Sequence, residues 1–261
     1  MLPAHKAIAL ESRLRDCRNV LTLGVKANFY EYSHAEQTVI RDCPKIYYPT
    51  SFYAELFDVM GKMMFPSCHT YRFAQDKIRQ TALFSIMNIP HPRTRVYYGN
   101  RQRMHITTDF MFPFIGKIPR GSAMGRGVFL IQNRADLNDY LTQSSIAYIQ
   151  EYLPIKQDIR VVVIGNRVVH AYWRIAPADD FRTNVAVGGR VSFDSVPLAA
   201  LELGLHTARM CHWNDVGMDI CCCNDSYYVL EANMKYGKEG FRQAGLNYSA
   251  MMEAMIDNGD I

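Results

Sequence analysis

The spacing of hydrophobic and polar residues is typical of strands in some segments of the chain and of helices in others, which predicts a mixed α/β protein. Short apolar runs rich in β-branched and aromatic residues predict strands at residues 19–25, 46–48, 94–98, 110–117, 128–131 and 146–150. Apolar residues at helical spacing predict helices at residues 7–17, 50–63, 73–88, 133–143, 199–211 and 241–256. The strand–helix order near the N-terminus predicts a small α/β unit over residues 1–70.

Two further pairs of apolar runs predict β-hairpins. Residues 158–164 and 167–174 flank Gly165-Asn166, a strong signal for a tight turn. Residues 218–223 and 227–233 flank Asn224-Asp225-Ser226, which we interpret as a three-residue turn.

The second hairpin carries a group of polar residues at alternating positions. Side chains alternate along a strand, so Glu231 and Asn233 lie on one face. A three-residue turn makes facing residue numbers sum to 450, which places Asp219 opposite Glu231 and Cys223 opposite Tyr227. Three oxygen ligands on a rigid support suit Mg²⁺, whose remaining coordination positions are usually filled by water and phosphate. The alternative is a strand pair with unrelated polar residues on its solvent face.

The turn length decides whether this cluster forms. A two-residue turn would shift the sum to 449 and place Asp219 opposite Leu230, whose side chain lies on the other face from Glu231.

A glycine-rich segment follows the strand predicted at residues 110–117. That strand ends in Lys117, and the segment from Gly121 to Gly127 leads into the next apolar run. Such a loop lets backbone N–H groups approach phosphate oxygens closely. The segment is not a P-loop, because no Gly-Lys-Ser/Thr leads into a helix. Alone it is a weak signal, since glycine-rich hairpin turns are common.

Composition narrows the class of protein further. Hydrophobic residues are 49% and charged residues 21% of the chain, ordinary values for a globular protein. A net charge of +4 without clustered Lys and Arg argues against a nucleic-acid partner. Seven cysteines without framework spacing predict a reducing, cytoplasmic location, and Cys221 to Cys223 cannot converge on one metal because neighbouring strand residues point to opposite faces. No apolar run approaches the ~20 residues of a membrane span.

The order of motifs resembles the ATP-grasp superfamily, and most closely its RimK-type carboxylate–amine ligases. The motifs are a helix lysine, a strand lysine with a glycine loop, Glu-Tyr-Leu, Asp-Ile-Arg, Asp-Phe-Arg-Thr-Asn with Gly-Gly, Gly-Met-Asp-Ile, Leu-Glu-Ala-Asn and Gly-Lys-Glu-Gly. The resemblance covers residues 70–256. It implies an ATP-grasp domain over residues 71–261, whose lobes at about 75–150 and 151–256 hold ATP between antiparallel sheets.

The resemblance also implies roles for individual residues. The residues it assigns to ATP binding are Lys77, Lys117, Gly121, Ser122, Gly125, Gly127, Glu151, Tyr152, Leu153, Asp158 and Arg160. Those beside the transferred phosphate are Arg174, Arg182 and Asn184, and the metal ligands are again Asp219, Glu231 and Asn233. The metal is Mg²⁺, for which Mn²⁺ is an acceptable substitute.

The implied activity is ATP-dependent amide formation through an acyl phosphate, from small-molecule or peptide carboxylate and amine substrates. Two alternatives stay open: an ATP-binding regulatory module, and an enzyme with kinase-type chemistry. The chain departs from relatives in its short N-terminal unit and in Met234-Lys235-Tyr236 after Asn233, where relatives often carry Ser-Pro. Both departures bear on the identity of the substrates, which the sequence leaves open. A homo-oligomeric state is possible and is also left open.

Overall fold

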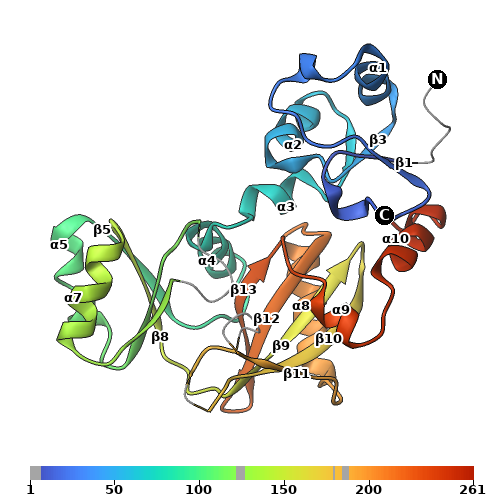
Figure 1. Cartoon of the computed structure of the whole chain (residues 1–261). Coiled ribbons are helices and arrows are strands. Elements are labelled where there is room, and N and C mark those ends of the chain that lie inside the picture. The colour runs from blue at the N-terminus through green and yellow to red at the C-terminus, as the bar shows by residue number, and fades with distance from the viewer. Residues whose placement is uncertain (1–6, 122–126, 179, 184–187) are drawn as a thin grey trace.

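The computed structural model describes residues 7–121, 127–178, 180–183 and 188–261. Its strands form three sheets (Figure 1), one parallel and two antiparallel. The predicted mixed α/β fold with antiparallel sheets is confirmed.

The first sheet is parallel and has the order β2-β1-β3-β4. Its strands are β1 (Ala7–Ala9), β2 (Val20–Thr22), β3 (Lys45–Tyr47) and β4 (Met63–Phe65). The accompanying helices are η1 (Ser12–Leu14), η2 (Phe29–Glu31), α1 (His34–Asp42) and α2 (Thr50–Val59), and α3 (Cys68–Phe73) leads out of this unit.

The second sheet is antiparallel and has the order β5-β8-β6-β7. Its strands are β5 (Thr94–Tyr98), β6 (Phe114–Lys117), β7 (Val128–Ile131) and β8 (Ile146–Glu151). The helices of this part are α4 (Lys77–Ile86), α5 (Gly99–Arg103), α6 (Ile106–Asp109) and α7 (Arg134–Gln143). Asp76 accepts a hydrogen bond from the Arg79 N–H at the start of α4, so that helix begins with Lys77 in its first turn.

The third sheet is antiparallel and has the order β11-β10-β9-β12-β13. Its strands are β9 (Gln157–Ile164), β10 (Arg167–Ile175), β11 (Arg190–Ser192), β12 (Asp215–Cys223) and β13 (Ser226–Asn233). Helix α8 (Leu198–Met210) packs on one face, and α9 (Glu239–Gln243) and α10 (Tyr248–Asp257) end the chain.

The central strand β9 shows how this sheet separates its two faces. Ile159, Val161 and Val163 share a core with residues of α8. The alternate residues face the other side, where Asp158 and Arg160 are buried and charged. Farther along that same side, Ile164 packs in a core with residues of β1, β3 and α10. One strand therefore supports both a charged site and the attachment of the first sheet.

Two predicted helices differ in the structure. Residues 7–17 form β1 and η1 instead of a helix, because Ala7 to Leu10 are buried on both sides of a parallel sheet. Residues 241–256 are not one helix: Gly245, with a φ of 69°, separates α9 from α10. Among the described residues, no helix combines the length and apolar character needed to cross a bilayer.

The turn between β12 and β13 has two residues, so the predicted three-residue turn is wrong. Cys223 pairs with Ser226 instead of Tyr227, and Asn224 and Asp225 adopt φ values of 49° and 59°. A β-bulge then shifts the register between Ile220 and Asp219, so the pairing sum changes from 449 to 450. Asp219 is therefore opposite Glu231 as predicted, but the bulge produces this pairing and not the turn.

We expect Asp225→Gly to stabilise the protein by about 0.5–1 kcal/mol, because Asn-Gly suits a tight turn with two positive φ angles. Asp225→Val places a β-branched residue in the same left-handed conformation and is expected to cost at least about 1 kcal/mol. The urea midpoint at unchanged m-value measures both effects. Equal midpoints for the two variants would contradict the observed turn geometry.

Candidate active site

A pocket lies between the second and third sheets and collects side chains from most of their strands. It is closed on one side by β6, β7 and β8 and on the other by β9, β10, β12 and β13, with α4 at one end. Its lining includes Lys77, Ile115, Lys117, Val128, Gln150, Glu151, Tyr152, Leu153, Asp158, Arg174, Phe181, Arg182, Thr183, Asp219, Leu230, Glu231 and Asn233.

The wall formed by the third sheet is built around two buried carboxylates. Arg174 donates to both oxygens of Asp158 through Nε and Nη2, at 2.7 and 2.6 Å. The Thr183 hydroxyl also donates to Asp158, at 2.6 Å. Asp158 faces Arg174 directly in the β9–β10 pairing, so the regular strand register produces this bidentate contact.

The second carboxylate, Asp219, is shared by two arginines. Arg160 Nε donates to Oδ1 at 2.6 Å, and Arg174 Nη2 lies 2.9 Å from Oδ2. The Asn233 side-chain nitrogen also donates to Oδ2, at 3.1 Å. Burial opposes the charged form of Asp219, but Arg160 and Arg174 outweigh it and lower the pKa of this carboxyl. Asp219 is therefore ionised at neutral pH.

Two buried lysines face this wall. Lys77 Nζ lies 3.2 Å from Glu231 Oε1. Burial lowers the pKa of Lys117 to about 8, with the nearby positive charge of Lys77 acting in the same direction and Glu231 opposing it. Lys117 is therefore mostly charged at neutral pH but loses its charge at a lower pH than an exposed lysine does.

Where the two lysines face the arginine–aspartate pairs, cations outnumber carboxylates by one; elsewhere in the lining, Arg182 and Glu151 carry opposite charges. Lys77, Lys117, Arg160 and Arg174 supply four cations, and Asp158, Asp219 and Glu231 supply three carboxylates. An anionic group entering the pocket would offset the repulsion between Lys77 and Lys117 and raise the pKa of Lys117. The site is accordingly suited to a polyanion.

Part of the pocket lining is apolar. Ile115, Val128, Leu153 and Leu230 line it, next to the segment that follows β8. The Glu151 carboxylate accepts a hydrogen bond from the Arg93 N–H at 2.5 Å, which fixes the start of this segment. A ligand with both an apolar part and an anionic part matches this mixed lining.

The donor set of Asp219, Glu231 and Asn233 fits a hard divalent cation. Asp219 and Glu231 face each other across the strand pair, and all three residues line the pocket. They offer carboxylate and amide oxygens without nitrogen or sulfur ligands, which suits Mg²⁺. Across the described part of the chain, this site included, no group of three or more His, Cys, Asp or Glu side chains is arranged to hold a metal. Two carboxylates and an amide are too few ligands for Mg²⁺. The ion would need further oxygen ligands from water or from a bound phosphate.

The structure brings together most of the residues singled out from the sequence. Lys77, Lys117, Glu151, Tyr152, Leu153, Asp158, Arg174, Arg182, Asp219, Glu231 and Asn233 all line the pocket. Arg160 is outside the lining but holds Asp219, and Arg182 is paired with Asp180 at 2.7 Å. Gly121 and Gly127 flank the glycine-rich segment, where the Ile118 N–H donates to the Gly127 carbonyl at 2.7 Å. Ser122, Gly125 and Asn184 lie outside the described residues.

Sequence reasoning missed Thr183 and, apart from Leu153, the apolar lining. Thr183 lies between two residues that the motif analysis did name, and its hydroxyl needs Asp158 as a partner. Ile115 is two residues before Lys117, so strand alternation could have placed it on the same face. The position of Leu230 depends on the bulge, which has no clear sequence signal.

Comparisons with known proteins agree with this geometry. Residues 74–256 match the sequence profile of the family described as RimK-like ATP-grasp domain. The coenzyme gamma-F420-2:alpha-L-glutamate ligase of Methanocaldococcus jannaschii is 30% identical over 200 residues, which cover 73% of this chain and 68% of that protein. The ribosomal protein bS6–L-glutamate ligase of Escherichia coli is 27% identical over 213 residues, covering 77% of this chain and 69% of that protein.

Solved structures show the same fold at low sequence identity. A RimK-domain ATP-grasp protein from Sphaerobacter thermophilus superposes with a TM-score of 0.70 at 15% identity, covering 95% of this chain and 98% of that chain. The D-alanine–D-alanine ligase of Bacillus anthracis superposes with a TM-score of 0.66 at 13% identity, covering 92% and 86%.

We expect ATP affinity to fall as pH rises from 7 to 9.5, by up to about tenfold, because Lys117 loses its charge. Its pKa of about 8 belongs to the ligand-free protein. Phosphate favours the charged form and raises that pKa, so the loss begins near pH 8 and continues above it. Calorimetric titration with ATP at each pH measures the effect. The Lys117→Met variant should bind ATP weakly, and its affinity should depend less on pH. A wild-type affinity independent of pH would contradict it.

Proposed function

The chain belongs to the RimK-like ATP-grasp family, and we propose that it joins a carboxylate to an amine, using ATP in the pocket between the second and third sheets. ATP-dependent ligation is the activity of this family's named relatives. The observation that carries the proposal for this chain is the meeting of Lys77 and Lys117 with the facing pair Asp219 and Glu231 in one pocket.

The proposed reaction has two steps. A carboxylate oxygen of the acid attacks the γ-phosphorus of ATP, the bond to the β-phosphate oxygen breaks, and an acyl phosphate and ADP form. The amine nitrogen then attacks the acyl carbon, phosphate leaves, and the nitrogen gives up a proton to yield an amide. Neither step needs a covalent bond to the protein, so the enzyme acts by positioning and by neutralising charge.

The charged wall is suited to that task. Lys77, Lys117 and Arg174 would face phosphate oxygens, while Leu153 and the segment from Glu151 would hold the base. Arg174 is held by Asp158 and Asp219, so its direction is fixed before the ligand enters. Such preorganisation costs no rearrangement at the moment of reaction. Arg182 and Asn184 are proposed to border the acyl phosphate.

Asp219, Glu231 and Asn233 are the residues that would hold Mg²⁺, or Mn²⁺ in its place. A bound divalent ion would contribute charge neutralisation at the phosphates. Arg160 acts on this group only through Asp219, by keeping its carboxylate ionised and oriented.

We also infer a division of the chain into a first unit over residues 1–70 and an ATP-grasp domain over residues 71–261. The parallel sheet occupies residues 7–65 and supports the first boundary. The two lobes, at about 75–150 and 151–256, correspond to the two antiparallel sheets, and the Glu151 segment connects them. A cytoplasmic location and a homo-oligomeric state remain predictions.

The substrates we propose are a small-molecule or peptide acid and an amine. The two named relatives are both L-glutamate ligases, one for a coenzyme and one for a ribosomal protein. The direct test is a matrix of acids and amines assayed for ADP release, with mass spectrometry of each hit. An amide product supports the proposal; a stable phosphorylated acid would show kinase-type chemistry, and ATP binding without turnover over the whole matrix would indicate a regulatory module.

Glu231→Gln is expected to reduce turnover by about two orders of magnitude or more, because it removes one negative charge from the metal-binding group. The fold should persist, since Lys77 keeps an amide oxygen as its partner. Asp219→Asn is a poorer test, because it removes the negative charge that two buried arginines share. It is expected to cost about 3 kcal/mol of stability.

The matched control is Glu202→Gln, an exposed residue on α8. Initial rates of ADP release under saturating substrates, with circular dichroism on each variant, separate loss of activity from loss of fold. A Glu231→Gln rate equal to that of Glu202→Gln would show that this face does not bind the catalytic metal.

A further inference from the structure

Helix α4 holds the outer edge of β13 next to the metal-binding group. In the described part of the chain, β13 is the last strand of its sheet, and α4 lies beside it (Figure 1). The Val229 N–H on this edge donates to the Pro90 carbonyl at 2.8 Å, and Ala232 is bonded by Gln80 of α4. Backbone groups that another strand would pair are therefore satisfied by α4 and the segment after it.

The Gln80 amide satisfies both backbone groups of Ala232. Its Nε2 donates to the Ala232 carbonyl at 2.8 Å, and its Oε1 accepts from the Ala232 N–H at 3.1 Å. Nε2 also donates to the Phe73 carbonyl at 2.9 Å, so both of its hydrogens are used. Gln80 and Ala232 are each only 2% exposed, so water does not replace these bonds. One side-chain amide thus takes the place of a neighbouring strand.

Ala232 is the residue between two of the proposed metal ligands. Its own side chain packs in the core that includes residues of α8, while Glu231 and Asn233 line the active site on the other face. Lys77, one turn before Gln80 on the same face of α4, lies 3.2 Å from Glu231. Helix α4 therefore meets two consecutive residues of β13 with two of its side chains.

The β-bulge explains why β13 benefits from a second support at this point. The strand departs from regular pairing at Leu230, directly before Glu231. A bulge bends its strand and disrupts the ladder locally, so pairing with β12 alone constrains the following residues less. Gln80 holds the strand from the opposite edge, two residues past the bulge.

We infer that Gln80 is a positioning residue for the metal-binding group: it fixes the backbone at Ala232 so that Glu231 and Asn233 present their oxygens to the pocket. This inference rests on the proposed function, which assigns the metal to those residues. A buried amide that served only the fold would change the fraction of folded protein. A positioning residue changes how well the folded protein binds a nucleotide together with its metal ion.

The test compares ADP binding with and without a divalent ion in the Gln80→Met variant. Methionine has nearly the same length but forms none of the three hydrogen bonds. ADP is titrated calorimetrically in EDTA and with saturating Mn²⁺, and the ratio of the two dissociation constants measures what the ion contributes. We expect this ratio to fall by about tenfold relative to wild-type, because groups that orient metal ligands typically have effects of that size. The metal-free ADP affinity should change much less.

The matched control is Gln37→Met in the first unit. Gln37 Nε2 donates to the Tyr32 carbonyl at 2.7 Å, so this variant also loses a side-chain bond to the backbone. Its ratio should equal that of wild-type. An unchanged ratio in folded Gln80→Met would overturn the inference, even if ADP affinity fell equally under both conditions. Wild-type ADP binding that does not respond to Mn²⁺ would overturn it as well.

Gln80→Asn covers the case in which Gln80→Met does not fold. It keeps the amide, but its side chain is one carbon shorter and is expected to lose contact with Ala232. Circular dichroism establishes the fold of each variant. If neither variant folds, the role of Gln80 is in folding and the inference is rejected.

Calorimetry does not depend on turnover, so it separates failure of this inference from failure of the proposed function. Amide formation by the wild-type enzyme, together with an unchanged Mn²⁺ effect in Gln80→Met, rejects the role of Gln80 alone. No amide from the wild-type enzyme with any acid and amine rejects the ligase function. A reduced Mn²⁺ effect in Gln80→Met would still assign Gln80 to the metal-binding group in that case.

Discussion

The buried ion cluster of Asp158, Arg160, Arg174 and Asp219 is the constraint on which the active site depends. All four residues are at least nine-tenths buried, and buried charges are tolerated only when their partners are in place. Strand register supplies that precision: Asp158 faces Arg174 across β9 and β10, and Arg160 faces Asp219 across β9 and β12. Because these strands cannot shift by one residue without separating the pairs, the cluster fixes the β9–β10 and β9–β12 registers, while the bulge in β13 decides where Glu231 lies.

The cluster needs space, and two glycines provide it. A Cβ on Gly217 would lie 2.9 Å from the Tyr236 Cβ and 3.1 Å from the Arg160 Cδ, so a larger residue would displace the arginine that holds Asp219. A Cβ on Gly240 would lie 2.3 Å from the Tyr172 ring, which no side-chain adjustment of a few tenths of an ångström could relieve. Gly217 of Gly-Met-Asp-Ile and Gly240 of Gly-Lys-Glu-Gly are therefore required by packing around the site.

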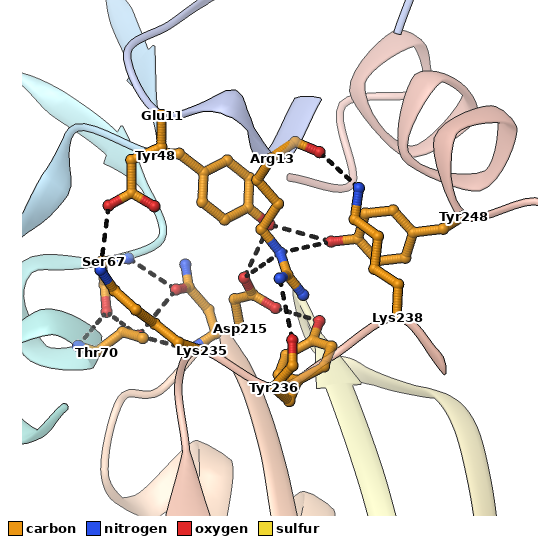
Figure 2. A network of polar contacts seen from close by, with 11 residues as sticks. Glu11, Arg13, Tyr48, Ser67, Thr70, Asp215, Lys235, Tyr236, Lys238 and Tyr248 are labelled. Carbon is orange, nitrogen blue, oxygen red and sulfur yellow. Dashed lines mark hydrogen bonds and ion pairs between the residues drawn. The ribbon is translucent and has the colours of Figure 1, made fainter. Parts of the chain in front are cut away.

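Strand β12 connects the active site to the first sheet. Asp215, Gly217 and Asp219 alternate onto one face, so both carboxylates lie on the same rigid strand. Asp215 is fully buried and accepts hydrogen bonds from the Tyr48 and Tyr236 hydroxyls (Figure 2), which ties the first sheet to the third. The contact between the first sheet and the C-terminal segment is thereby held in fixed relation to the phosphate-binding wall.

The sequence by itself determined the class of fold, most of the strands and the charged residues of the site, because strand alternation and short motifs are local properties. It predicted Asp219 opposite Glu231 from an incorrect turn, since a bulge at Leu230 compensates for the shorter turn and leaves no local pattern. It also read residues 7–17 as a helix, because a strand buried on both faces lacks alternation. Only the tertiary structure brought Glu11 and Arg13 to Lys235, more than two hundred residues away, because that contact depends on how the first sheet packs against β9 and α10.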